Sequence, residues 1–331
     1  MNISIESIIA IYPDRTLSIR ELAENAEVSV IDAEASGISR LHAASVGTLT
    51  TDLAADAVKI ALSKAKIDSK SVDQLAFISE CIGDYLYMDA SKTVIKKMGG
   101  RDDNLIYSSD FFRGNSGTLG IIEIVGNQLT ANPNIRCSVI STSLVWESHS
   151  NKRRLGDTFL GDGAGAIVMS DHLSEKNRIL SISVKSLSRY SLVSGFKYGG
   201  TLYDFTADVV HNNKFVYSIL DQECYKGVME NVISVAVEVG KEALEKAGCT
   251  VEDISYIGIS GFNKTVNKDI VSKFGVKEII DPLNDKGFLG SLGAIEVLSQ
   301  FINDDNIKYG KKMLLFTVGI DVNVEALVIQ K

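Results

Sequence analysis

Two stretches of the sequence place glycines around a position where chemistry could occur. GNSGTLGIIEI begins at Gly114, and GFLGSLGAIEV begins at Gly287. Glycine permits a sharp turn before a helix, and the free N–H groups and dipole at a helix N-terminus favour negative charge. Asn115, at the tip of the first turn, occupies the place where this field would lower the pKa of a thiol nucleophile. The same glycines would also serve if their only role were to let two central helices approach closely.

The glycine-opened helix is part of a longer internal repeat. From Gly117 and Gly290 onward, five of eight positions are identical. ALSKAKIDSKSVDQLAFI from Ala61 and ALEKAGCTVEDISYIGI from Ala243 align without gaps, each as an amphipathic helix followed by a β-branched run. The matched core positions are Val72/Ile254, Leu75/Ile257 and Phe77/Ile259.

The repeat predicts an α/β protein built from two similar halves. Residues 166–169 and 326–329 read as equivalent late strands, apolar enough to be buried on both faces. Each half runs helix, strand, connector, strand, glycine-opened helix, strand, strand, and this alternation favours sheets rich in parallel strands. The halves should divide near residues 171–180, and three prolines in the chain indicate no flexible linker between them.

Composition excludes several function classes. The chain has 331 residues, is 45% hydrophobic, and carries a net charge of −8, so it lacks the basic field that nucleic acid or an anionic membrane would attract. No apolar run approaches the length of a transmembrane helix, and the start, MNISIESIIAIYPDRT, does not read as a signal peptide. The four cysteines occur singly, so we expect a cytoplasmic protein without a structural metal or cofactor.

Three segments resemble one enzyme family. LGDGAGAIVMSD (160–171), SGISRLHAA (36–44) and TTDLAADAVKIAL (50–62) are similar, in this order, to segments of β-ketoacyl-ACP synthase III, a condensing enzyme of the thiolase-fold superfamily. The resemblance implies a five-layered αβαβα thiolase fold of two duplicated halves, residues 1–172 and 173–331. The two glycine-opened helices would then be the paired central helices of that fold.

The resemblance also implies where a Cys-His-Asn triad would stand. Asp110 and Gly117 match the family's anchors around the cysteine, and the residue between them at the family's spacing is Asn115. The histidine position reads Ser260 and the asparagine position reads Phe288. An amide is not a nucleophile, and residues that act as a unit lose nearly all rate when replaced together. We therefore expect a degenerate triad and no condensing activity.

Neighbouring family positions are kept only in part. Asn263 matches the asparagine of the family's H-Q-A-N motif, and Gly319 keeps one glycine of the oxyanion segment. Ser116 is a candidate substitute nucleophile, although the anchors place it one residue late, which should point it into the helix. Cys81 lies where the family lines its acyl tunnel, and a buried cysteine there is more often a small hydrophobe than a nucleophile. His149 is the best outside candidate for a base.

The substrate side of the resemblance is equally incomplete. Arg154 matches a basic family position, and Tyr87, with Tyr85 and Met88, falls where family dimers exchange tunnel residues or else packs within its own chain. Three lysines recur on the helix after SGFN, namely Lys264, Lys268 and Lys273. A lysine row is usually a solvated face, but beside the tunnel mouth it would suit docking of an acidic acyl carrier protein, in preference to free acyl-CoA.

Three functional hypotheses follow. The first is a non-catalytic or accessory subunit that forms a heterodimer with an active ketosynthase homologue, or a homodimer, in polyketide- or fatty-acid-type secondary metabolism. The second is an acyltransferase that moves an acyl group from carrier protein or CoA to an alcohol or amine without forming a C–C bond. The third, an active synthase, would require a cysteine at the turn, and none lies between Cys81 and Cys137.

Overall fold

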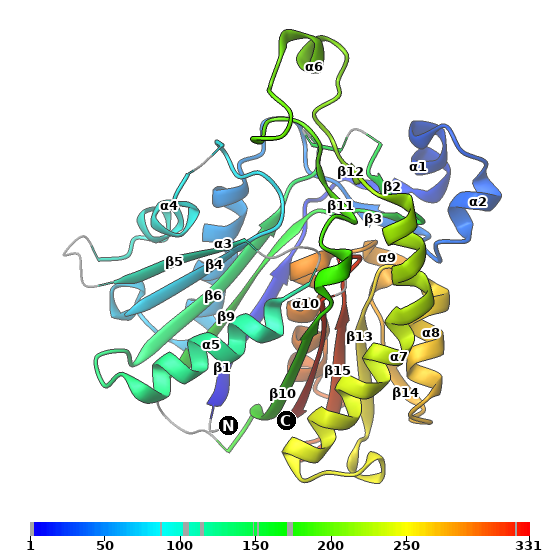
Figure 1. Ribbon diagram of the computed structural model, residues 1–331. Helices are drawn as coiled ribbons and strands as arrows, with labels where there is room; N and C mark the ends of the chain where they lie inside the picture. Colours follow the sequence, from blue (N-terminus) through cyan, green and yellow to red (C-terminus); the bar gives the residue numbers. More distant parts are fainter. Residues whose placement is uncertain are drawn as a thin grey trace.

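A computed structural model (Figure 1) describes residues 3–86, 88–101, 106–112, 116–147, 149–150, 152–170, 175–321 and 323–331. Its centre is a ten-stranded sheet that contains five strands from each half of the chain. The first half contributes, in spatial order from the middle outward, β1 (Ile3–Ile11), β9 (Gly163–Ser170), β6 (Cys137–Leu144), β4 (Gln74–Ser79) and β5 (Tyr107–Phe112). The second half mirrors this order with β10 (Arg178–Ser186), β16 (Asn323–Gln330), β15 (Lys312–Val318), β13 (Tyr256–Ser260) and β14 (Glu278–Ile280).

The two halves meet at the middle of the sheet. β1 and β10 pair antiparallel through Ile3↔Ile179 and Ser4↔Arg178 only, so each half keeps its own five-stranded unit. Within each half the outer three strands are parallel to one another, as expected for strands connected through helices. The next strand inward, β9 or β16, runs antiparallel to them.

Helices form three further layers. α3 (Thr50–Ala65) and α4 (Ala90–Lys97) cover one outer face, and α7 (Gln222–Ala247) and α8 (Lys264–Ser272) cover the other. Between the two five-stranded units of the sheet lie α5 (Thr118–Ala131) and α10 (Gly290–Asn303), each of which contacts strands of both halves as well as the other helix. The predicted five-layered αβαβα arrangement is confirmed, and α5 and α10 are the two glycine-opened helices.

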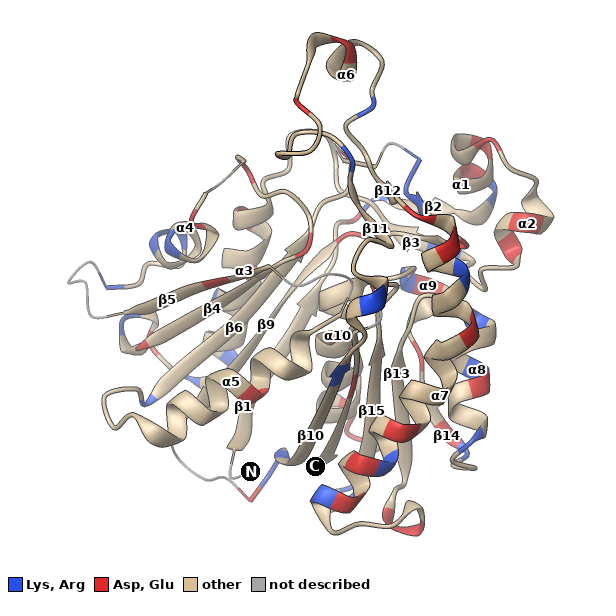
Figure 2. Ribbon diagram, in the orientation of Figure 1, with Lys and Arg blue, Asp and Glu red and all other residues tan. Residues whose placement is uncertain are grey.

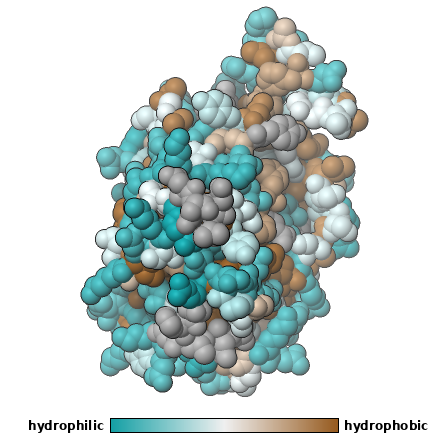
Figure 3. Space-filling model, turned by 90° about the vertical axis from the view of Figure 1, so that its left-hand side faces the viewer, coloured by the Kyte–Doolittle hydropathy of each residue, from teal (hydrophilic) through white to brown (hydrophobic). Residues whose placement is uncertain are grey.

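Smaller elements surround this frame. They are β2 (Thr16–Ser18), α1 (Ile19–Ala26), α2 (Val30–Glu34), β3 (Arg40–His42), β7 (Arg154–Leu155), β8 (Thr158–Phe159), β11 (Ser194–Phe196), α6 (Ala207–His211), β12 (Tyr217–Ile219) and α9 (Leu283–Lys286), with 3₁₀ turns at Ser69–Ser71, Ser188–Tyr190 and Val251–Asp253. The excursion between β11 and β12, which carries α6, projects at the top of Figures 1 and 3 with apolar side chains among its surface residues.

The internal repeat corresponds to equivalent strands in the core. The six predicted core positions (Val72, Leu75, Phe77, Ile254, Ile257, Ile259) are all buried, as are residues 166–169 and 326–329 in β9 and β16. The predicted boundary at 172/173 lies outside the described residues and stays a prediction. No helix in the described part of the chain is long and apolar enough to cross a membrane.

The GDGAGA segment is a packing motif. A Cβ on Gly165 would lie 2.7 Å from a methyl of Leu292 and 2.8 Å from one of Ile295, so glycine there lets α10 lie directly on β9. Asp162 accepts hydrogen bonds from the backbone N–H groups of Ala44 (2.7 Å) and Trp146 (2.9 Å). These contacts join the start of β9 to two distant segments of the first half.

A buried cation completes this junction. The Arg153 guanidinium donates to Asp162 at 2.8 Å and to Glu147 at 2.7 Å, and both Arg153 and Asp162 are buried.

Replacement Arg153→Leu leaves the Asp162 carboxylate without its cation, so we expect the free energy of unfolding to fall by about 3–5 kcal/mol in urea titrations. The matched control is Arg154→Leu, because Arg154 is exposed, and its effect should stay within about 0.5 kcal/mol. Equal losses in the two variants would contradict this account of the junction.

Candidate active site

The amino ends of α5 and α10 meet at the centre of the molecule. The hydroxyl of Thr118, the first residue of α5, donates to the carbonyl of Ser291 in the first turn of α10 at 2.6 Å. The hydroxyls of Ser291 and Thr142, on β6, lie 2.8 Å apart. Because both helix dipoles point their positive ends at this spot, it is the natural place in the fold for negative charge.

A buried carboxylate occupies the amino end of α5. Glu325, on β16, accepts from the backbone N–H groups of Leu119 (2.9 Å) and Gly120 (3.1 Å), and the Thr317 hydroxyl donates to it at 3.1 Å. The residue is 0% exposed. Gly117, at φ +116°, makes the turn that presents these N–H groups.

A second buried carboxylate occupies the amino end of α10. Glu80, directly after β4 and 2% exposed, accepts from the N–H of Ser291 at 2.6 Å. Gly290 has φ +44°, and a Cβ there would lie 2.0 Å from the Glu80 carboxylate. Glycine at this position is therefore required by the backbone conformation and by the space that the carboxylate fills.

The two carboxylates come from opposite halves. Glu325 of the second half caps α5 of the first, and Glu80 of the first half caps α10 of the second. The two glutamates do not occupy equivalent positions of the repeat. When Leu75 is matched to Ile257, Glu80 corresponds to Phe262 along the sequence. Through the strand registers of the two halves, Glu325 corresponds to Gly165. Sequence reasoning missed both residues, although a glutamate inside the apolar run VEALVI was a visible signal.

Ser260 and Phe288 are packed into the core beside this junction. Ser260 ends β13 and is buried against α10, where a Cβ on Gly293 would lie 1.7 Å from its hydroxyl oxygen. Phe288 is buried with its ring edge-to-face on Phe262. Its N–H donates to Phe159 at 2.9 Å, which ties the α9–α10 connection to β8. Asn115, the third position of the inferred triad, lies outside the described residues.

The other inferred site residues make structural contacts. The buried Ser116 hydroxyl donates to the Asn323 carbonyl at 2.8 Å, and the Asn323 carbonyl also accepts from the N–H of Gly319 at 3.1 Å. The Asn263 side chain caps α8 by accepting from the N–H groups of Thr265 and Val266. Ser116 and Gly319 are thus brought together, whereas Asn263 is committed to a helix N-terminus.

Cys81 and His149 lie near each other in the fold but in different environments. Burial raises the pKa of the Cys81 thiol to about 12, so it stays protonated. Burial also lowers the pKa of His149 below its ordinary value, partly offset by a hydrogen bond to the backbone of Ile82, the residue after Cys81. No group of three or more His, Cys, Asp or Glu side chains within the described ranges is arranged to hold a metal ion.

A pocket of about 340 Å³ opens beside His149, and we call it the hairpin pocket. Loops after β4 and β6, the turn before α3 and the β11–β12 excursion all contribute to its wall, through residues that include Thr48, Ile82, Asp84, Val145, His149 and Phe215. It lies at the carboxyl ends of the parallel strands, where ligands bind in open α/β sheets.

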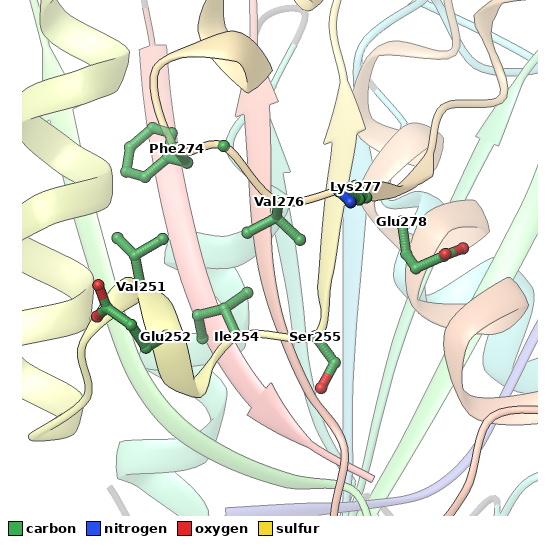
Figure 4. A pocket seen from close by; sticks show the side chains of 9 residues that line it. Val251, Glu252, Ile254, Ser255, Phe274, Val276, Lys277 and Glu278 are labelled. Carbon is green, nitrogen blue, oxygen red and sulfur yellow. The ribbon is translucent and has the colours of Figure 1, made fainter.

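A larger pocket of about 390 Å³ lies elsewhere. Figure 4 shows Phe274, Val276 and Ile254 around it, with Ser255 at the amino end of β13. This is the end of the strand opposite to Ser260, so the pocket is separate from the junction of the central helices.

The predicted substrate-side residues are mostly on the surface. Arg154 is exposed and donates to the carbonyl of Gly156, and Tyr85 is exposed at the rim of the hairpin pocket. Lys264 and Lys268 line a pocket of about 420 Å³ beside α8, whereas Lys273 caps the end of that helix. Figure 2 shows acidic residues interspersed with basic ones along α7 and α8. Tyr87 lies outside the described residues.

Known proteins share this architecture. A β-ketoacyl-[acyl-carrier-protein] synthase III of Wolbachia pipientis is 23% identical over 320 residues, which cover 93% of this chain and 92% of that protein. The structure of 3-oxoacyl-[acyl-carrier-protein] synthase III from Aquifex aeolicus superposes with a TM-score of 0.82 at 17% identity, covering 99% of this chain and 100% of that one. A structure of an acyltransferase, ChlB3, gives a TM-score of 0.82 at 18% identity over 100% and 98% of the two chains. No family profile matches the chain.

The contact between Ser260 and Gly293 provides a test of the packing at the junction. Overpacking by Gly293→Ala should cost about 1–3 kcal/mol in the free energy of unfolding. The higher helix propensity of alanine offsets roughly 1 kcal/mol of this cost. In a Ser260→Gly background, which removes the clashing side chain, the same replacement should cost less. A double-mutant cycle by chemical denaturation measures the difference, and equal costs in both backgrounds would show that the two residues do not touch.

The lowered pKa of His149 predicts a pH dependence of stability. The unfolded chain takes up this proton near pH 6.5, whereas the folded protein takes it up only at lower pH. Between these values the unfolded state binds more protons, so the free energy of unfolding falls as pH falls. His149→Leu should therefore lose less Tm than the parent between about pH 7.5 and pH 5.5. His211→Leu, at an exposed site on α6, should behave as the parent; equal losses in all three would contradict the burial of His149.

Proposed function

We propose that this chain, which has the thiolase fold and is similar in sequence to β-ketoacyl-ACP synthase III, is a non-catalytic or accessory subunit. It pairs with an active ketosynthase homologue in polyketide- or fatty-acid-type secondary metabolism, in the cytoplasm. In this role the fold supplies a dimer partner and a wall of the substrate channel, while the homologue supplies the chemistry.

The Glu325 carboxylate at the amino end of α5 is the observation that carries this proposal. Acyl transfer through a thiolase fold needs this helix end for an anion, because a thiolate and an oxyanion are both stabilised there. In this chain the N–H groups of Leu119 and Gly120 are already bonded to a resident carboxylate. An incoming anion would therefore find these two donors already occupied.

The remaining groups do not replace the lost chemistry. Ser116 donates its proton to a backbone carbonyl, which cannot act as a general base, and the Cys81 thiol has a pKa of about 12. Phe288 offers no polar atom beyond its backbone. Ser260, which stands where the family resemblance places a histidine, is packed against α10.

Pairing with a second chain is supported by the free edge of the sheet. β5 is the outermost strand of the first half, and Tyr107 and Phe112 are exposed along it. Unpaired backbone groups on such an edge are a template for a strand from another chain. We propose a homologous ketosynthase as that partner, with a homodimer as the alternative, and an acyl carrier protein docking beside Lys264 and Lys268.

An acyltransferase is the second candidate. The hairpin pocket places a neutral imidazole beside apolar walls. The structure of ChlB3, which is named an acyltransferase, has the same fold. Such a protein would bring an acyl thioester and an alcohol or amine together, and proximity alone lowers a barrier by several kcal/mol. This route needs no covalent intermediate on the chain.

Intact-protein mass spectrometry separates these functions. The chain, expressed alone and together with a homologous ketosynthase, is incubated with a panel of acyl-carrier-protein and acyl-CoA donors. We expect no acyl adduct on this chain and an adduct on the co-purifying partner, because neither Ser116 nor Cys81 is an activated nucleophile. The control is the partner with its nucleophilic cysteine replaced by alanine, which should carry no adduct.

A stable adduct mapped to Ser116 or Cys81 would overturn the non-catalytic proposal and identify the nucleophile. Absence of an adduct, together with formation of an ester or amide when an alcohol or amine is added, would support direct transfer. Failure of the chain to associate with any ketosynthase would remove the accessory role.

A further inference from the structure

The hairpin pocket has the size and the wall of a small-ligand site. Its volume of about 340 Å³ lies at the lower end of the range for ligand pockets. Ile82, Val145 and Phe215 give it apolar sides that come from three separate segments. The excursion between β11 and β12 contributes Phe215 to the wall, and Phe215 is held there by stacking on Phe196 with ring centroids 4.9 Å apart.

The charges around the pocket exclude an anionic ligand. Asp84 is on the wall, and no lysine or arginine is among the described residues that line it. The Asp84 carboxylate already accepts from the N–H and hydroxyl of Thr51, and Lys97 lies 3.7 Å from it outside the lining. A carboxylate or phosphate entering the pocket would leave water without gaining a cation, which is costly.

His149 supplies a hydrogen-bond acceptor in this setting. Burial keeps the ring neutral, and one ring N–H is bonded to the backbone carbonyl of Ile82. The other nitrogen of a neutral imidazole carries a lone pair and accepts. The residue is held in place because its carbonyl accepts from the N–H of Tyr217 at 2.9 Å and its ring lies edge-to-face with Phe196.

We propose that the hairpin pocket binds a small aliphatic alcohol. The hydroxyl donates to the unprotonated nitrogen of His149, and the alkyl chain lies against Ile82, Val145 and Phe215. An uncharged donor fits because the pocket offers an acceptor, a carboxylate that is already paired, and apolar walls. This inference deepens the second candidate function, in which the alcohol would be the acyl acceptor. Binding itself depends on neither a partner ketosynthase nor acyl transfer and is measured without either.

The single tryptophan makes the test direct. Trp146 follows Val145 in the chain and packs against Tyr217 with ring centroids 5.3 Å apart, so its fluorescence reports on the pocket. The purified full chain is titrated near pH 8 with 1-hexanol, with hexyl methyl ether and with hexanoate. We expect saturable binding of the alcohol, and binding of the ether weaker by about fivefold, since one hydrogen bond contributes about 1 kcal/mol. Hexanoate should bind more weakly still.

Variants assign the effect to His149. His149→Leu should abolish the preference for the alcohol over the ether, and His149→Gln, which keeps an acceptor, should retain part of it. His211→Leu serves as the matched control and should bind as the parent does. Equal binding of alcohol and ether by the parent chain, tighter binding of hexanoate, or a linear response without saturation would each overturn the proposal. The ligand comparison on the parent chain decides the matter even if a variant does not fold.

Discussion

Two buried carboxylates hold the centre of this molecule together. The amino ends of α5 and α10 converge between the sheets, and each end carries unpaired N–H groups that water cannot reach. Glu325 and Glu80 satisfy them, each from the half to which the helix does not belong. The two halves are thereby joined by buried hydrogen bonds at the helix ends, where the dipoles favour an anion. The positive φ angles of Gly117 and Gly290 follow from this geometry, since both turns aim backbone N–H groups at a carboxylate.

The scaffold and the chemistry of this family are separable in physical terms. Asp162 joins the start of β9 to two distant segments, and Gly165 lets α10 lie on β9, so both residues serve the packing of the scaffold. Ser260 and Phe288 fill the positions where the family resemblance expects reactive groups, and both are satisfied by packing. The contacts of these residues therefore serve the packing of the framework, and the ligand proposed for the hairpin pocket needs no nucleophile on the chain.

The repeat allowed the fold to be predicted because it is a property of many residues at once. Equivalent positions such as Leu75 and Ile257 recur with the same burial, so two similar α/β halves followed from the repeat. The order of the five layers came from the family resemblance. The site depended on long-range contacts that no periodicity encodes. Glu325 reaches α5 across some two hundred residues of sequence, and the wall of the hairpin pocket is drawn from segments whose proximity only the fold reveals.

The central claim is that Glu325 takes the place of the anion that this helix end would otherwise stabilise. The most direct measurement is the pKa of a thiol introduced by Asn115→Cys, followed by pH-dependent alkylation and mapped by mass spectrometry, with and without Glu325→Gln. With Glu325 present the thiol should titrate at or above the ordinary value of about 8.5, and Glu325→Gln should lower its pKa because the helix field is released. A pKa well below 7 with Glu325 in place would contradict the claim, since it would show that the amino end of α5 still stabilises an anion.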